Sequence, residues 1–272
     1  MPELTTEDGV TIHYSDLGEG TPIVFLHGWA MSGAVWHSQL KLADRYRLIV
    51  PDFRGHGRSS APDEGYSFDC FARDVAELVF RLNLERVIIV AWSMGALVAL
   101  QTFPLIRERL AALILVAGTA KFASSDGYSS GVPSTEIRAM GRRLQKYYTE
   151  TIRSFVSGMF TEEERASGIC EQLTAPEGTY LFPDPHAARE ALKSLAAADL
   201  RDLLPSVHLP VLLIHGSADT TCPVDAANCM AKLLPKAELS VMTGVGHAPF
   251  MSRPEEFAAI LGSFLEGIDA EN

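Results

Sequence analysis

A serine stands where a buried strand is expected to turn sharply into a helix. Ala91-Trp92-Ser93-Met94-Gly95 follows the β-branched run at 86–90 and precedes a helix-forming run at 96–102. A strained turn of this kind exposes the serine hydroxyl and needs small neighbours, so the typical pattern is small-x-Ser-x-Gly. Ala91 replaces the glycine that usually begins the pattern, and alanine is small enough for the close approach. Ser93 is therefore a candidate nucleophile.

Two further side chains could activate that hydroxyl. His247 lies in a glycine-rich loop after a strand expected at 237–242, and Asp219 follows a strand expected at 210–215. A serine hydroxyl is a poor nucleophile until an imidazole can take its proton. The imidazole in turn needs a carboxylate, which fixes its tautomer and stabilises its charged form. The three residues together predict acyl transfer.

The order of the three residues along the chain supports this interpretation more strongly than any of them alone. Taken singly, each is most often an ordinary turn or surface residue. The order Ser93, Asp219, His247 is that of the α/β-hydrolase fold, and each residue follows a predicted strand. Asp126, several residues beyond a strand at 112–117, is the alternative acid.

Backbone groups near the nucleophile predict an oxyanion hole. One donor is expected to be the N–H of Met94, directly after the nucleophile. The other is expected to be the N–H of Trp29, in a His-Gly-Trp loop after a buried strand that begins at Pro22. Gly28 permits the turn that directs the Trp29 amide toward the site.

The elements that must hold these residues follow from hydrophobic patterning. Val10–Ser15 alternates, which predicts an edge strand, and Phe68–Leu82 is an amphipathic helix. Continuous apolar strands between helices indicate a parallel sheet covered on both faces, with ligands at the carboxyl ends of its strands. The buried strands are expected at 47–51, 86–91, 112–117, 210–215 and 237–242, besides the one that begins at Pro22.

The alternation breaks between about residues 120 and 202. This segment contains no strand signal, and helices are expected at 134–160 and 185–197. An insertion of this length is more than a connection. We expect 120–202 to be a helical cap over the site, and 1–119 with 203–272 to be the α/β-hydrolase core.

The helix expected at 134–160 has two distinct faces. One face is an apolar stripe. The other carries Arg138, Arg142, Lys146 and Arg153 with Arg143 beside them, so five basic and two acidic residues give the segment a charge of +3. Such a face suits an acidic partner, although an ordinary solvated helix face has the same spacing. The residues expected to line an acyl tunnel are Trp29, Trp92, Met140, Phe155, Met159 and Phe250.

Composition narrows the class of protein. Of the 272 residues, 47% are hydrophobic, and no apolar run approaches the ~18–20 residues of a membrane span. A net charge of −11 argues against general nucleic-acid binding. The four cysteines show no zinc-type pairing, and the polar, acidic start is unlike a secretory signal, so we expect reduced thiols in a cytoplasmic protein. No metal, P-loop or dinucleotide motif appears.

These motifs resemble those of the α/β-hydrolase superfamily over essentially the whole chain. The narrower resemblance is to the pimeloyl-[acyl-carrier protein] methyl ester esterases of biotin synthesis. It is carried by Leu26–Trp29 with Trp36 downstream, Trp92–Gly95, Ala198–Arg201 and Gly246–Pro254. In that family basic cap residues receive the acidic carrier protein. The resemblance implies that part for Arg138, Arg142, Lys146 and Arg153.

The expected function is hydrolysis of a carboxylic ester without a cofactor, with methanol as the preferred leaving group. A broad small-ester esterase, an enol-lactonase or a cofactor-free perhydrolase would use the same three side chains. A non-catalytic hydrolase fold that binds a small ligand is the alternative from another class of protein.

Overall fold

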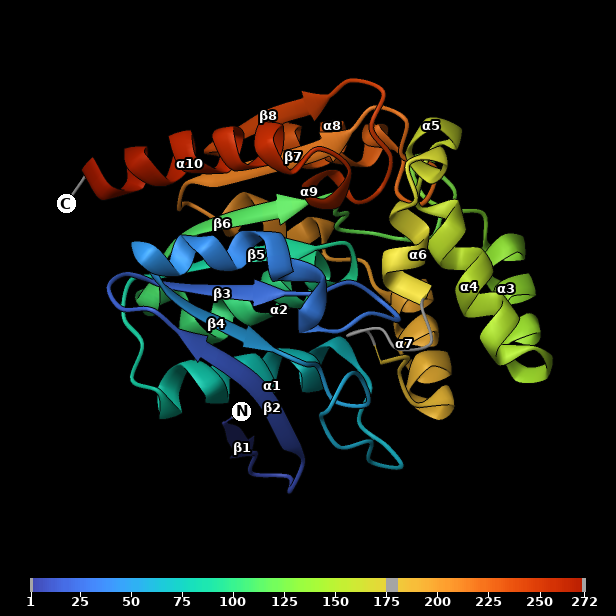
Figure 1. The fold of residues 1–272 in the computed structure, drawn as a ribbon, viewed down its shortest axis with the longest axis horizontal. Helices are drawn as coiled ribbons and strands as arrows, with labels where there is room; N and C mark the ends of the chain where they lie inside the picture. Colours follow the sequence, from blue (N-terminus) through green and yellow to red (C-terminus); the bar gives the residue numbers. More distant parts are fainter. Residues whose placement is uncertain (1, 175–180, 271–272) are drawn as a thin grey trace.

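The computed structural model describes residues 2–174 and 181–270, and its centre is an eight-stranded sheet (Figure 1). The strands lie in the order β1-β2-β4-β3-β5-β6-β7-β8. β2 is antiparallel to both of its neighbours, and the other neighbouring strands run parallel. The strands are β1 (Glu3–Thr5), β2 (Thr11–Leu17), β3 (Pro22–Leu26), β4 (Arg47–Pro51), β5 (Val87–Trp92), β6 (Leu110–Val116), β7 (Val211–Gly216) and β8 (Ala237–Met242).

Helices cover both faces of this sheet, which confirms the fold class expected from the strand pattern. On one face α1 packs against α2, and α8 packs against β7 and β8. On the other face η1 contacts α9, which contacts α10. The residues of β3 and β5 are all buried, because both of their sides face helices. The bounds are η1 (Gly33–Asp44), α1 (Phe68–Arg81), α2 (Met94–Ile106), η2 (Arg107–Arg109), η3 (Arg201–Ser206), α8 (Val224–Leu233), α9 (Pro249–Ser252) and α10 (Pro254–Ala270).

One strand occupies a different place from the one expected. The alternation at Val10–Ser15 predicted an edge strand, but β2 pairs with β1 on one side and β4 on the other. The edge strand on this side of the sheet is β1. It has only three residues, which is too short for alternation to be recognised from sequence.

Five helices gather beside the carboxyl ends of the parallel strands (Figure 1). They fall between β6 and η3 in the chain, and the two ends of this segment meet. The Leu200 N–H donates to the Ala120 carbonyl at 2.8 Å, and the Lys121 ammonium pairs with Asp199 at 2.9 Å. We refer to 120–202 as the cap, and its treatment as a separate domain stays a proposal. Its helices are α3 (Ser134–Lys146), α4 (Tyr148–Gly158), α5 (Glu162–Ala166), α6 (Ile169–Thr174) and α7 (Pro185–Ala197).

The prediction of a single helix at 134–160 is wrong, because the structure has two helices there. Tyr147 separates α3 from α4 with φ −139° and ψ 59°, outside the helical region. The sequence Tyr147-Tyr-Thr-Glu-Thr151 is rich in aromatic and β-branched residues, which are weak helix formers. Arg153 therefore lies on a different helix from Arg138, Arg142 and Lys146.

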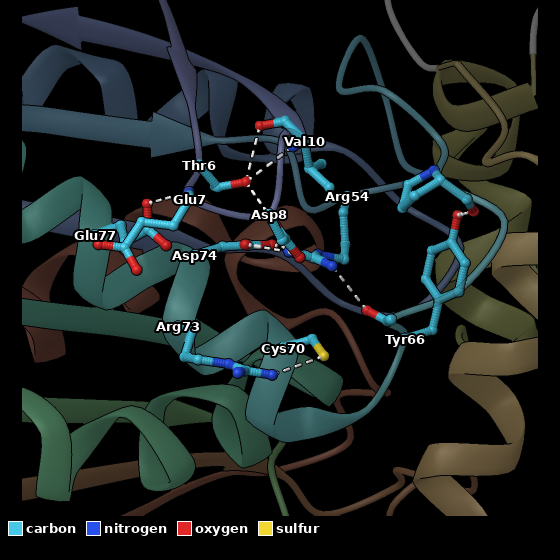
Figure 2. Close-up of polar contacts among 12 residues, drawn as sticks. Thr6, Glu7, Asp8, Val10, Arg54, Tyr66, Cys70, Arg73, Asp74 and Glu77 are labelled. Atoms are coloured by element: carbon cyan, nitrogen blue, oxygen red, sulfur yellow. Dashed lines mark hydrogen bonds and ion pairs between the residues drawn. The ribbon is translucent and has the colours of Figure 1, made fainter.

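A buried ion pair ties the loop after β4 to the first helix (Figure 2). The Arg54 guanidinium donates to both carboxylate oxygens of Asp74 on α1, at 2.6 and 2.7 Å, and both side chains are buried. It also reaches Asp8 at 2.9 Å, in the turn between β1 and β2, and the Gly65 carbonyl at 3.1 Å. Paired and hydrogen-bonded on several sides, the buried charge is compensated.

No helix of the described residues has the length and apolar character needed to cross a membrane.

Candidate active site

Ser93 lies at the junction between β5 and α2. β5 ends at Trp92 and α2 begins at Met94, so the serine alone makes the turn. Its φ is +55° and its ψ is −116°, and its amide donates to the Val116 carbonyl on the neighbouring strand β6. Such a backbone costs a non-glycine residue about 1–3 kcal/mol and persists only where the surroundings impose it. The turn holds the side chain at the carboxyl end of the sheet.

His247 contacts Ser93 with one ring nitrogen and Asp219 with the other. Nε2 lies 2.8 Å from Ser93 Oγ, and Nδ1 lies 2.7 Å from Asp219 Oδ2. Since an ionised carboxylate can only accept, Nδ1 carries the proton and donates it to Asp219. The lone pair of Nε2 then faces the serine hydroxyl, which is the arrangement a general base needs. Asp126 lies elsewhere, exposed in a turn between Ser125 and Tyr128.

Asp219 is held as an ionised acceptor. Its Oδ1 accepts from the backbone N–H groups of Thr221 and Cys222, at 2.8 and 2.9 Å. Burial alone would raise the pKa of Asp219. The charge of His247, with hydrogen bonds from His215 and His247, outweighs burial and lowers this pKa to about 2. The carboxylate is therefore charged throughout the pH range in which an esterase would work.

Two residues support this arrangement that the sequence did not point to in this role. The His215 ring, at the end of β7, donates through Nε2 to the Cys222 carbonyl at 2.7 Å, and the same nitrogen lies 3.4 Å from Asp219 Oδ2. The Trp92 indole N–H donates to the His247 carbonyl at 2.8 Å. A histidine four residues before the acid, at the end of the same strand, was the available signal for the first contact. No local signal marked the second.

A narrow cavity of about 20 Å³ lies at Ser93. Trp29 and Met94, whose amides were expected to form the oxyanion hole, line it together with Ser93. Met94 is the first residue of α2, where backbone N–H groups have no acceptor within the helix. The partial positive charge of a helix N-terminus also favours a developing oxyanion.

Three of the six residues expected in an acyl tunnel line this cavity. These are Trp29, Met140 and Phe155. The rings of Trp29 and Phe155 meet edge to face, with 4.8 Å between their centroids. The other three are buried elsewhere. Trp92 and Phe250 pack against each other, Phe250 also stacks on Trp36, and the Met159 carbonyl accepts from the His247 amide. Helical and aromatic spacing in the sequence could not separate the two groups, since both are apolar.

A wider cavity of about 370 Å³ lies between α3 and α4. It shares five lining residues with the narrow cavity, four of them apolar: Phe122, Met140, Phe155, Leu192 and Thr221. The side chains that separate Ser93 from the wider cavity are therefore largely apolar. Glu136 and Arg143 line its outer part. The arrangement suits an elongated apolar chain that enters through the cap.

The four cap cations singled out from the sequence are all exposed: Arg138, Arg142, Lys146 and Arg153. None of them forms an ion pair with a described carboxylate. Arg138 also lines a cavity of about 300 Å³ between α3 and α7, beside Arg189 and Lys193. Positive charge on this side of the cap thus comes from two helices that neighbour each other, besides α4.

The remaining reactive groups near the site have ordinary explanations. Cys222 lines the cavity, but burial raises the pKa of its thiol and keeps it protonated. All four cysteines are free. Among the described residues, no three His, Cys, Asp or Glu side chains are grouped so that they could hold a metal ion.

Comparison of sequences shows similarity to esterases over almost the full chain. A model of the alpha/beta hydrolase family matches residues 23–260. A pimeloyl-[acyl-carrier protein] methyl ester esterase of Nitrosomonas europaea is 33% identical over 254 residues, which cover 92% of this chain and 97% of that protein. An esterase of the same description from Aeromonas hydrophila is 31% identical and covers 94% of this chain and 100% of that protein.

Solved structures show the same architecture. An esterase from Exiguobacterium antarcticum has a TM-score of 0.89 and 28% identity, covering 97% of this chain and 98% of that one. A thermophilic esterase from Thermogutta terrifontis has a TM-score of 0.86 and 26% identity, covering 98% of both chains. Likeness of this extent, in sequence and in three dimensions alike, means that the chain belongs to the alpha/beta hydrolase family, as a carboxylesterase.

Proposed function

We propose that this esterase hydrolyses the methyl ester of pimeloyl-acyl carrier protein in biotin synthesis, with Ser93, His247 and Asp219 as its catalytic residues. The observation that carries the catalytic assignment is the unbroken pair of hydrogen bonds from Ser93 Oγ to His247 Nε2 and from His247 Nδ1 to Asp219, at 2.8 and 2.7 Å. The description shared by the relatives from Nitrosomonas and Aeromonas supports the substrate.

The reaction follows from these contacts. Ser93 Oγ attacks the ester carbonyl carbon while His247 Nε2 takes the hydroxyl proton. The resulting oxyanion accepts hydrogen bonds from the backbone N–H groups of Met94 and Trp29. His247 then gives its proton to the departing methoxide. Methanol is released, and the acyl group remains bonded to Ser93 Oγ.

Water completes the cycle. His247 Nε2 takes a proton from a water molecule, whose oxygen attacks the acyl carbonyl carbon. The bond to Ser93 Oγ breaks, the serine recovers its proton from His247, and the free carboxylic acid departs. Asp219 stays ionised throughout, because its pKa of about 2 lies far below the working pH. It stabilises the imidazolium that forms twice in each cycle.

The cap supplies the argument for a carrier-linked substrate. An apolar chain that occupied both neighbouring cavities would leave between α3 and α4, where Arg143 lies. A carrier attached to that chain would meet Arg138, Arg142, Lys146 and Arg153 on the same helices, all of them exposed. Since the rest of the chain is strongly acidic, these cations are a local exception that suits an acidic carrier. Four free cysteines fit a reducing compartment, and we place this reaction in the cytoplasm.

A broad small-ester esterase is the second candidate. The solved esterase from Exiguobacterium antarcticum supports it, at 28% identity over nearly the whole chain. The cavity at Ser93 is narrow, about 20 Å³, which favours a small acyl group over a long one. Both candidates share one chemistry, so only the substrate distinguishes them.

The nucleophile is tested first. We expect Ser93→Ala to lower the kcat for a short nitrophenyl ester by about 10⁶-fold, as loss of a triad serine does elsewhere. A fluorophosphonate should label the wild-type protein at Ser93 and leave the variant unlabelled. Undiminished turnover by the variant would contradict the mechanism. Failure of the wild type to label would favour a ligand-binding protein instead.

The substrate is tested on the cap. We expect reversal of charge in Arg142→Glu with Lys146→Glu to lower kcat/KM for pimeloyl-carrier methyl ester by about 10-fold or more, and to leave the short nitrophenyl ester unaffected. Equal losses on both substrates would remove the docking face. In a biotin-requiring strain that lacks its pimeloyl ester hydrolase, the wild-type chain should restore growth and Ser93→Ala should not. Failure to restore growth, with good esterase activity, would favour the small-ester candidate.

A further inference from the structure

The corner between α4 and α5, residues 159–164, is bonded directly to the loop that carries His247. The His247 amide donates to the Met159 carbonyl at 2.7 Å. The amide before it, that of Gly246, donates to Glu164, at 3.0 Å to Oε1 and 3.2 Å to Oε2. Figure 1 shows α5 beside the turn that follows β8. Two consecutive backbone amides of the histidine loop thus donate to acceptors in the cap.

Hydrogen bonds with Thr161 hold the Glu164 side chain in place independently of its contact with the histidine loop. Glu164 is the third residue of α5, and Thr161 caps this helix. The Thr161 amide donates to Glu164 Oε2 at 2.7 Å, and the Glu164 amide donates to the Thr161 hydroxyl at 3.2 Å, which is a complete capping box. A carboxylate accepting from two backbone amides makes charge-assisted hydrogen bonds, which are stronger than neutral ones. The side chain is therefore a preorganised acceptor for Gly246.

Close packing shows that the contact is built for a residue without a side chain. A Cβ on Gly246 would lie 2.5 Å from the Met159 carbonyl oxygen and 2.7 Å from Glu164 Oε2. The first of these atoms is backbone and cannot move alone. The histidine loop and the cap corner fit together only because position 246 is glycine.

Three hydrogen bonds then determine where the His247 backbone lies. The cap holds the amides of Gly246 and His247, and the Trp92 indole holds the His247 carbonyl at 2.8 Å. On the far side of the loop the Ala218 amide donates to the Val245 carbonyl. A catalytic side chain must stay within about 0.5 Å of its productive position, and its supporting residues decide whether it does.

We propose that Glu164 is a positioning residue for the reaction: its carboxylate, supplied by the cap, holds the peptide before His247 so that Nε2 stays in line with Ser93 Oγ. The proposal rests on His247 as the general base. Glu164 touches neither substrate nor reacting atoms. Loss of its carboxylate would let the loop relax from the cap corner and misalign the imidazole.

The test compares Glu164→Ala with two variants that share its helix. Glu164→Gln keeps one acceptor oxygen for Gly246. Thr161→Ala removes the other half of the capping box and destabilises α5, yet leaves the carboxylate in place. Each is assayed for kcat and KM with a short nitrophenyl ester, for Tm, and for the rate at which a fluorophosphonate labels Ser93. That rate reports nucleophile activation without turnover.

We expect Glu164→Ala to lower kcat and the labelling rate by about 10- to 100-fold with little change in KM, the pattern of a misplaced catalytic group. Glu164→Gln should recover most of both rates. Thr161→Ala should lower Tm about as much as Glu164→Ala does, because both break the capping box, but it should leave both rates near those of the wild type.

Two outcomes would overturn the proposal. One is a wild-type labelling rate in Glu164→Ala. The other is a fall in kcat and in the labelling rate that follows the fall in Tm alike in Glu164→Ala and Thr161→Ala. That result would mean that only the stability of α5 matters. If Glu164→Ala does not fold, Glu164→Asp replaces it. Its shorter side chain keeps an acidic residue in the first turn of α5 but draws the carboxylate back from Gly246, so a positioning role requires it to lower both rates, and wild-type rates in this variant would overturn the proposal. His247→Ala serves as a reference: if it is fully active, the proposed mechanism fails and not merely the role of Glu164.

Discussion

The cap meets the core along two seams that use the same kind of bond with different consequences. At the outer seam, α7 contacts the loop at 52–67: the Asp184 amide donates to the Gly55 carbonyl at 2.9 Å, and the Ser194 hydroxyl donates to the Tyr66 carbonyl at 2.6 Å. At the inner seam, the Met159 carbonyl and the Glu164 carboxylate hold the amides of 246–247. The outer loop carries no reacting group, whereas the inner loop carries the proposed base. On our proposal, the effect of a cap contact on catalysis therefore depends on which group its partner holds, and not on the strength of the contact.

The largest expected effect concerns stability at the outer seam. Asp74→Ala leaves the buried Arg54 guanidinium with the half-exposed Asp8 as its ion-pair partner and with the neutral Gly65 carbonyl. Breaking one side of a buried ion pair costs about 3–5 kcal/mol, so we expect a loss of that size in the free energy of unfolding by urea. The kcat of the folded fraction should be unchanged, because the outer loop carries no reacting group. Asp8→Ala is the control, with an expected cost below about 1 kcal/mol. A large fall in kcat for Asp74→Ala would erase the distinction between the seams.

A matched pair of glycine variants contrasts the seams directly. In Gly246→Ala the new Cβ meets the Met159 carbonyl oxygen at 2.5 Å, and in Gly55→Ala it meets the Ala187 Cβ at 2.2 Å. Both variants must push cap from core and should be less stable. A displacement of about 1 Å at a catalytic group can cost about 100-fold, so we expect a kcat loss of that order for Gly246→Ala alone. Equal kcat values for the two variants, measured well below their Tm, would show that the inner seam has no special role.

The smallest expected effect is a loss of stability in mild acid. Burial lowers the pKa of His27 to about 4, and that of His56 to about 3, where His27 also contributes. Both fold in the neutral form, so between about pH 6.5 and these values the unfolded chain binds more protons and stability falls as pH falls. We expect each to cost about 2 kcal/mol between pH 7 and pH 5. Asp219 titrates below this window.

Urea unfolding at each pH provides the measurement. Asp74, whose pKa burial raises to about 6, titrates in the same window with the opposite sign, so the variant must be compared with the wild type. His56 lies in the outer loop, where its Nδ1 contacts the Arg54 carbonyl, and His56→Asn should remove about 2 kcal/mol of the loss between pH 7 and pH 5. A pH dependence as steep in His56→Asn as in the wild type would mean that His56 binds its proton equally in the folded and unfolded chain.

The core was far more predictable from sequence than the cap, for a physical reason. Continuous apolar runs predict the strands at 86–91 and 210–215, and short local motifs predict the turns that follow them. Residues at the carboxyl ends of parallel strands converge of necessity, which is why Ser93, Asp219 and His247 could be grouped in advance and do lie within hydrogen-bond distance.

Cap contacts depend instead on tertiary packing. The break at Tyr147 reflects a local weakness in helix propensity, which periodicity overrode in the sequence-based prediction. Apolar spacing could not tell that Met140 and Phe155 face the cavity while Met159 does not. The capping box from Thr161 to Glu164 is visible in the sequence, but its contact with Gly246, 82 residues away, is not.

The carbonyl of Met159 has a consequence for timing. A substrate that must pass between α3 and α4 needs the cap to yield, and any outward swing of α4 would draw Met159 away from the His247 amide. If His247 is the general base, as we propose, opening the cap would then separate Ser93 from its proton acceptor. While the cap is open, the Ser93 hydroxyl would not be activated. We therefore expect ester cleavage to begin only after the cap has closed over the bound acyl chain.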